Sequence, residues 1–219
     1  MNGPARNKSR SFGNPGPRTS GNRQASVGKK PIRPRILIVC EGKKTEPKYF
    51  LGFRSTSDVY GWGLETIRVV EKAKEINDAD GPFDQIWCVF DRDSFPPDNF
   101  DNAIKMVESL KDKGFRIAYS NEAFELWYVL HFEYLNAALP RDRYIAKMTE
   151  YLGQAYQKGN PNNYRLLQEK GNEEQAIRNA ERLMTIHPDG TPISQCCPLT
   201  TIHELVKVLR AIEKQGANR

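Results

Sequence analysis

The stretch RILIVCEG at residues 35–42 decides which fold class the sequence can adopt. Its run from Ile36 to Cys40 is short, apolar at every position and rich in β-branched side chains. Such a run is typical of a strand that is covered on both faces, as in a parallel sheet. Glu41 follows the run directly, so we expect this carboxylate at the carboxyl end of the strand.

Further segments of strand and helix type follow along the chain. Apolar or β-branched runs predict three more strands, at residues 66–70, 85–90 and 115–119. Helical spacing and capping residues predict helices at 45–53, 71–76 and 99–113, a buried helix from Asn121 to about Phe132, and three later helices at 144–157, 173–185 and 200–213. This order predicts an α/β fold with a mostly parallel sheet, right-handed crossovers and no strand beyond residue 135.

The charge of the chain divides it into unequal parts. The full sequence holds 33 Lys or Arg and 27 Asp or Glu, but residues 1–34 contain eight of the basic residues and no acidic one. The remainder has 25 against 27, a net charge of about −2. We therefore expect a disordered basic tail at 1–34, an α/β domain at 35–135 and a helical C-terminal region at 136–219 that packs on it.

The tail has two interpretations, a solubilising extension or a polycation that strengthens binding to phosphates without reading sequence. The sequence contains no apolar run of membrane-spanning length. Its four cysteines form no spacing pattern typical of a disulfide framework. We expect a protein of the reducing cytoplasm that does not bind membranes.

Acidic residues follow two of the predicted strands. Glu41 comes directly after the first, and Asp91 and Asp93 follow the run at 85–90. Carboxyl ends of parallel strands share one edge of a sheet, and residues i and i+2 on an extended chain face the same way. Three carboxylates gathered there would repel one another unless a divalent cation, which favours oxygen ligands, lay between them. Shared coordination requires Glu41 to lie within ~10 Å of an aspartate.

Two neighbouring features add to this prediction. Glu125 lies near the start of the apolar helix expected after Asn121, where a buried carboxylate is expensive unless it is paired or bound to metal. The stretch Gly42-Lys43-Lys44-Thr45 lacks the upstream glycine of a P-loop, because Leu37 stands there. Its lysines can instead neutralise a substrate phosphate beside the acids.

Four segments of the chain resemble the RloB-like family. They are ILIVCEGKKTE at 36–46, VFDRDSF at 89–95, SNEAFELWYVLHF at 120–132 and PLTTIHELVKVL at 198–209. Together they span residues 35–210, and their order is more specific than any one of them. The family is associated with the Toprim fold, the α/β module of topoisomerases, primases and overcoming-lysogenisation-defect nucleases.

The resemblance implies roles for named residues. Glu41 would be the Toprim glutamate, acting as acid/base or metal ligand, and Asp91 and Asp93 would be the metal-binding pair. It further implies that Glu46, Ser120 and Glu125 form a second metal position. Lys158 would correspond to a lysine of the family. One or two Mg²⁺ or Mn²⁺ ions would then serve a nuclease that cuts DNA or RNA.

The resemblance also implies a biological setting. RloB-like proteins are expected to work beside a separately encoded ABC/AAA-type ATPase in restriction or abortive-infection loci. The chain would accordingly be an effector nuclease of bacterial phage defence, with the number of subunits left open. Two alternatives remain, a non-catalytic subunit that holds nucleic acid and a metal-dependent nucleotidyl transferase such as a primase.

Overall fold

The described part of the chain is built around one five-stranded sheet. The computed structural model describes residues 33–55, 57–92 and 97–217. The strands are β1 (Ile36–Cys40), β2 (Ser57–Gly61), β3 (Gln85–Asp91), β4 (Phe115–Asn121) and β5 (Leu199–Thr200). Their spatial order is β2-β1-β3-β4-β5, with the first four parallel and β5 antiparallel to β4. The predicted α/β class with a mostly parallel sheet is confirmed, whereas its assignment to the Toprim fold stays a prediction.

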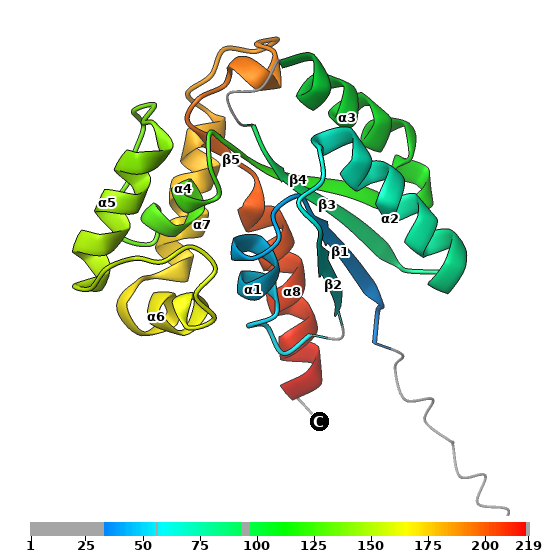
Figure 1. Cartoon of the computed structure of the whole chain (residues 1–219), viewed down its shortest axis with the longest axis horizontal. Coiled ribbons are helices and arrows are strands. Elements are labelled where there is room, and N and C mark those ends of the chain that lie inside the picture. Colours follow the sequence, from blue (N-terminus) through cyan, green and yellow to red (C-terminus); the bar gives the residue numbers. More distant parts are fainter. Residues whose placement is uncertain (1–32, 56, 93–96, 218–219) are drawn as a thin grey trace, which may run out of the picture. The chain divides into compact units, whose positions relative to one another are not determined.

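Helices cover both faces of this sheet (Figure 1). The helices are α1 (Thr45–Phe50), α2 (Thr66–Asp80), α3 (Pro97–Ser109), α4 (Glu125–Val129), α5 (Arg141–Leu152), α6 (Asn163–Lys170), α7 (Glu173–Met184) and α8 (Ile202–Ala217), with short 3₁₀ turns at Lys111–Lys113 and Ile193–Gln195. Helices α2 and α3 pack on one face, and α1 and α8 pack on the other. This arrangement follows from right-handed crossovers, because α1 leads outward to β2 while α2 and α3 lead the opposite way.

The central strands are buried on both faces, as their apolar runs predict. Every residue from Ile36 to Cys40 is fully buried, and so, to within a few per cent, are the residues from Ile86 to Phe90. Because no face of β1 or β3 meets water, these strands need no alternation of polar and apolar side chains.

The strand predicted at 66–70 is wrong, because these residues form the first turns of α2. Val69 and Val70 are β-branched and favour a strand locally, but they belong with Ala73 and Ile76 to one buried helical stripe. The second strand is instead β2, at the sheet edge, where its half-exposed sequence SDVYG lacks a recognisable apolar run.

The helix expected to start at Asn121 is also misplaced. Asn121 is the last residue of β4, and its Nδ2 donates hydrogen bonds to the carbonyls of Ser194 (3.3 Å) and Cys196 (2.9 Å). The helix that follows, α4, is only five residues long. Beyond residue 135 the chain adds α6 and the short strand β5, neither of which was predicted. The expected tail at 1–34 lies outside the described residues except for Arg33 and Pro34, and the division into domains stays a prediction.

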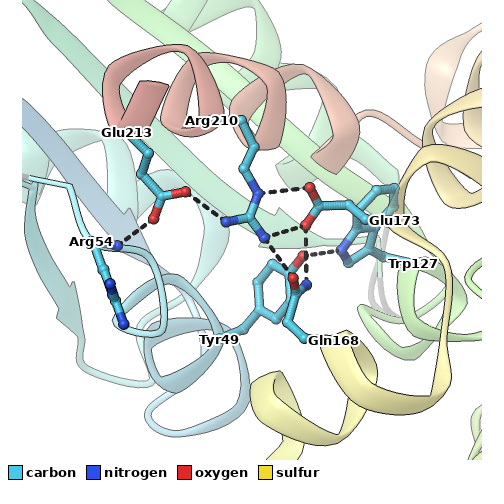
Figure 2. A network of polar contacts seen from close by, with 7 residues as sticks. All are labelled: Tyr49, Arg54, Trp127, Gln168, Glu173, Arg210 and Glu213. Carbon is cyan, nitrogen blue, oxygen red and sulfur yellow. Dashed lines mark hydrogen bonds and ion pairs between the residues drawn. The ribbon is translucent and has the colours of Figure 1, made fainter. Parts of the chain in front are cut away.

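Polar bonds join the helices that lie on the α1 side of the sheet (Figure 2). Arg210 of α8 donates two hydrogen bonds of 2.7 Å to Glu173 of α7, and one of 3.0 Å to Gln168 of α6. Nearby, Trp127 of α4 donates to the hydroxyl of Tyr49 of α1 at 2.8 Å. These bonds join α8 to α6 and α7, and α4 to α1. Within the described ranges, no helix has both the length and the apolar character needed to cross a bilayer.

Candidate functional site

The candidate site lies where the order of strands reverses. From β1 the chain turns outward to β2, and then crosses back to β3 and β4 on the other side of β1. In open parallel sheets, a ligand crevice forms at such a switch point, beyond the carboxyl ends of the two diverging strands. Glu41 directly follows β1, and Asp91 is the last residue of β3. The two acids therefore lie at the topological switch point, where a ligand crevice is expected.

The carboxylate of Glu41 is held toward Asp91. Its Oε2 accepts a hydrogen bond from the backbone nitrogen of Asp91 at 3.0 Å, and its Oε1 accepts one from Thr66 Oγ1 at 3.3 Å. The backbone nitrogen of Glu41 donates to the carbonyl of Val89 at 2.9 Å, which continues the ladder between β1 and β3. Glu41 thus lies well inside the separation that shared coordination with Asp91 requires.

A pocket of about 330 Å³ opens at this edge of the sheet. Its charged lining residues are the acids Glu41, Glu46, Asp91 and Glu125 and the bases Lys43, Lys44, Arg141 and Lys158. They come from the loop after β1, from α1, β3, α4 and α5, and from the segment between α5 and α6. Segments separated by more than 100 residues thus place both signs of charge around one cavity.

Glu46 carries its charge in a buried position. It is 7% exposed, and it packs so closely on Gly42 that a Cβ added there would lie 2.1 Å from its Oε2. Burial raises the pKa of Glu46, and the negative charge of Glu125 raises it further; a hydrogen bond from its own backbone and the charges of Lys158 and Arg141 oppose the rise. A cation bound beside Glu46 would offset the same penalty.

Glu125 is 1% exposed and is stabilised by two groups from the segment after α5. The hydroxyl of Tyr156 donates to its Oε1 at 3.1 Å, and the ammonium of Lys158 lies 3.3 Å from the same oxygen. Burial, followed by the charge of Glu125, raises the pKa of Tyr156, which therefore stays a hydrogen-bond donor. Sequence reasoning missed Tyr156, although it lies two residues before Lys158.

Arg141 pairs with Asp91 across the pocket. Its guanidinium lies 3.3 Å from Asp91 Oδ2, and it is the first residue of α5. Sequence reasoning missed Arg141, because no spacing relates it to an aspartate 50 positions earlier. The pair places a positive group beside one of the acids of the pocket.

The comparison with protein families agrees with the motifs that shape this pocket. The family model described as RloB-like protein matches residues 36–209. The chain belongs to the RloB-like family. Membership of this family fits a protein associated with restriction or defence. Searches of curated proteins and of solved structures gave no match.

Of the residues that the RloB-like resemblance implicates, Ser120 does not line the pocket, and Asp93 is not among the described residues. Ser120 is fully buried; its hydroxyl lies 2.9 Å from Thr200 Oγ1, on the side of β5. Asp93 lies outside the described residues, so of the expected aspartate pair only Asp91 can be placed. The structure thus brings together Glu41, Glu46, Asp91, Glu125 and Lys158 from the predicted set.

The donor set of this RloB-like pocket suits a hard divalent cation. Its acids offer only carboxylate oxygens, the ligands that Mg²⁺ and Mn²⁺ take. Within the ranges 33–55, 57–92 and 97–217, no three His, Cys, Asp or Glu side chains are grouped tightly enough to hold a metal ion. Glu41 and Asp91, which share a hydrogen bond, are the residues that could begin such a site.

Proposed function

We propose that this RloB-like protein hydrolyses phosphodiester bonds of DNA or RNA with Mg²⁺ or Mn²⁺. One observation carries the proposal. Four carboxylates and four positively charged side chains line one pocket at the topological switch point of the sheet. Binding of an uncharged ligand does not require this many charged side chains of both signs. A metal-assisted reaction at a phosphate requires acidic side chains to bind the metal and basic side chains to bind the phosphate.

The residues divide into two groups by what they would contact. Glu41 and Asp91 would hold the metal, which supplies an activated water and neutralises charge on the phosphate when bound. Lys43 and Lys44 make no ion pair with any described residue, so their ammonium groups are available for phosphate oxygens. Lys158, oriented by Glu125, can donate a hydrogen bond to the leaving oxygen.

We further propose that the activity serves bacterial phage defence from the cytoplasm, together with a separately encoded ABC/AAA-type ATPase. The support is family membership. Toprim character would agree with this role, since the acids lie at the carboxyl ends of β1 and β3, two parallel strands.

A non-catalytic subunit that only holds nucleic acid is the second candidate. Two observations favour it: Arg141 already neutralises Asp91, and the described residues hold no ready group of three metal ligands. On this alternative the acids would be structural, and the free lysines would bind phosphate alone.

Cleavage assays with matched variants separate the two candidates. Full-length protein, with and without the partner ATPase, is incubated with single-stranded DNA, duplex DNA and tRNA in EDTA, Mg²⁺ or Mn²⁺. The proposal expects cutting only with metal, and at least about 100-fold slower cutting by Glu41→Gln and Asp91→Asn. The control Glu169→Gln removes an exposed ion pair with Arg165 on α6 and should cut like wild type. Binding without cutting in every condition would favour the second candidate.

A further inference from the structure

Two aromatic side chains form a stacked pair at the end of the edge strand. The rings of Tyr60 and Trp62 lie 5.1 Å apart between centroids and are inclined by only 8°. Tyr60 is 37% exposed, and Trp62 is half-buried against the core. Residues i and i+2 of an extended chain face the same way, so both rings lie on one side of β2. Since β2 is the outermost strand, no further strand covers them on that edge among the described residues.

Lys43 joins the pocket to the loop that follows this aromatic pair. The lysine lines the pocket, and its side chain runs across Gly63, the residue after Trp62. A Cβ added at Gly63 would lie 2.6 Å from Lys43 Cε, and the backbone of Gly63 has a φ of +69°, so both the space and the conformation require glycine. The two loops are in contact at Gly61 as well, where an added Cβ would lie 2.3 Å from the carbonyl oxygen of Gly42.

A cation lies over the Trp62 ring on the side of α2. Lys72 Nζ lies 5.6 Å from the centre of the Trp62 ring and 2.8 Å from Glu75 Oε2. Glu75 partly neutralises Lys72, whereas Lys43, whose side chain packs over Gly63, pairs with no described carboxylate. An aromatic face next to an unpaired lysine is the combination that binds a base and its phosphate together.

We propose that the Tyr60–Trp62 pair is a stacking platform for the bases of a single-stranded nucleic acid whose backbone passes Lys43 into the pocket. The inference rests on the proposed function and narrows its substrate class. Bases of a paired duplex are stacked on one another and do not offer their faces, whereas unpaired bases stack on exposed aromatic side chains. The pocket would therefore receive a single strand, an overhang or a loop, of DNA or RNA.

Two stacked rings do not by themselves make a platform for nucleic-acid bases. A second stacked pair in the described part of the chain serves as the control. Phe132 and Tyr151 are also stacked, at 4.7 Å and 7°, with Lys147 6.0 Å from the Tyr151 ring. Tyr151 lies ten residues along α5 from Arg141 of the pocket, or ~15 Å at the helical rise. Of these two stacked pairs, Tyr60–Trp62 is the one followed by a loop that a lysine of the pocket contacts, so Tyr151→Ala is a matched control.

Binding in EDTA tests the platform without depending on cleavage. The chain has three tryptophans, and Trp87 and Trp127 are buried, so quenching of fluorescence by an added 12-nucleotide single strand reports Trp62. We expect quenching by the single strand and little by a duplex of the same sequence, measured near 0.15 M salt to weaken purely ionic binding. Tyr60→Ala should weaken single-strand binding by about 10-fold or more, and Tyr60→Phe, which keeps the ring, should bind like wild type.

The outcomes of the platform and of catalysis can be told apart. Quenching by the single strand together with the Tyr60→Ala loss supports the platform, even if no condition yields cleavage and the catalytic proposal fails. Equal quenching by duplex, wild-type affinity of Tyr60→Ala, or an equal loss in Tyr151→Ala overturns the platform, even if cleavage is robust. Melting temperatures of the three variants exclude a loss of binding through unfolding.

Discussion

Gly42→Ala changes the pocket at one side chain, the carboxylate of Glu46. The added Cβ would lie 2.1 Å from Glu46 Oε2, which falls 1.3 Å short of the 3.4 Å at which ordinary contact begins. Since Gly42 lies in the loop after β1 and the clashing atom ends a flexible side chain, the carboxylate and not the sheet has to move. The substitution therefore displaces one acid of the pocket by about 1.3 Å.

The functional effect should exceed the effect on stability. A misplacement of ~1 Å at a reacting centre lowers rates by about 100-fold. Accommodating one methyl group against a movable carboxylate should lower the free energy of unfolding by only about 1 kcal/mol. For a domain of this size that corresponds to a melting temperature about 2–4 °C lower.

The assay measures metal-dependent cleavage and the melting temperature for three proteins: wild type, Gly42→Ala and Gly190→Ala. Gly190 has a φ of +82°, and an added Cβ there meets nothing within 4 Å. Alanine in that left-handed conformation costs about 1 kcal/mol, so the control matches the loss of stability without touching the pocket. We expect Gly190→Ala to cut at the wild-type rate.

Cleavage by Gly42→Ala within threefold of wild type would refute the reasoning, because the position of Glu46 would then be irrelevant to the reaction. An equal loss of cleavage in Gly190→Ala would refute it too, because reduced stability would account for the effect.

Three further predictions concern stability. Arg210→Met removes both 2.7 Å bonds to Glu173, whose partners are only 25% and 17% exposed (Figure 2), so the free energy of unfolding in denaturant should fall by about 2–4 kcal/mol. The exposed control Arg165→Met should lower it by under about 0.5 kcal/mol, and equal losses would contradict a role of the Arg210 network in stability. Burial lowers the pKa of His131 from 6.5 to about 4, so the unfolded chain takes up the proton first as the pH falls. The free energy of unfolding should be highest above pH 6.5 and lower by on the order of 2–3 kcal/mol at pH 4.5, and His131→Gln should weaken this pH dependence. Mg²⁺ or Mn²⁺ at ~100 times its dissociation constant should stabilise the wild type by about 2.7 kcal/mol, and should stabilise Asp91→Asn by much less. An equal rise of the melting temperature in both proteins would contradict metal binding at Asp91.

Local sequence predicted the centre of the sheet well and its periphery poorly. β1 and β3 are continuous apolar runs, which short-range pattern suffices to recognise. β2 sits at the edge with a half-exposed sequence, and the first turns of α2 carry β-branched residues that locally favour a strand. In both places packing against the rest of the chain, which a short window does not contain, decided the conformation.

For the candidate site, the acids were foreseeable and their partners were not. Glu41 and Asp91 end buried strands, so their position at one edge follows from the α/β pattern. Arg141 and Tyr156 reach the acids from 50 and 31 residues away, and Ser120, expected near them, faces Thr200 instead. Each of these depends on how α5 and β5 pack, and no local spacing carries that information.

The sequence by itself determined the buried strands, the acids that follow them and the family, because each depends on residues adjacent in the chain. Tertiary structure alone decided that the acids meet basic side chains in one pocket, and that a lysine of this pocket packs on the loop after a pair of stacked rings. The physical reason is that a charge or an aromatic face acts through its distance in space, which the path of the whole chain sets.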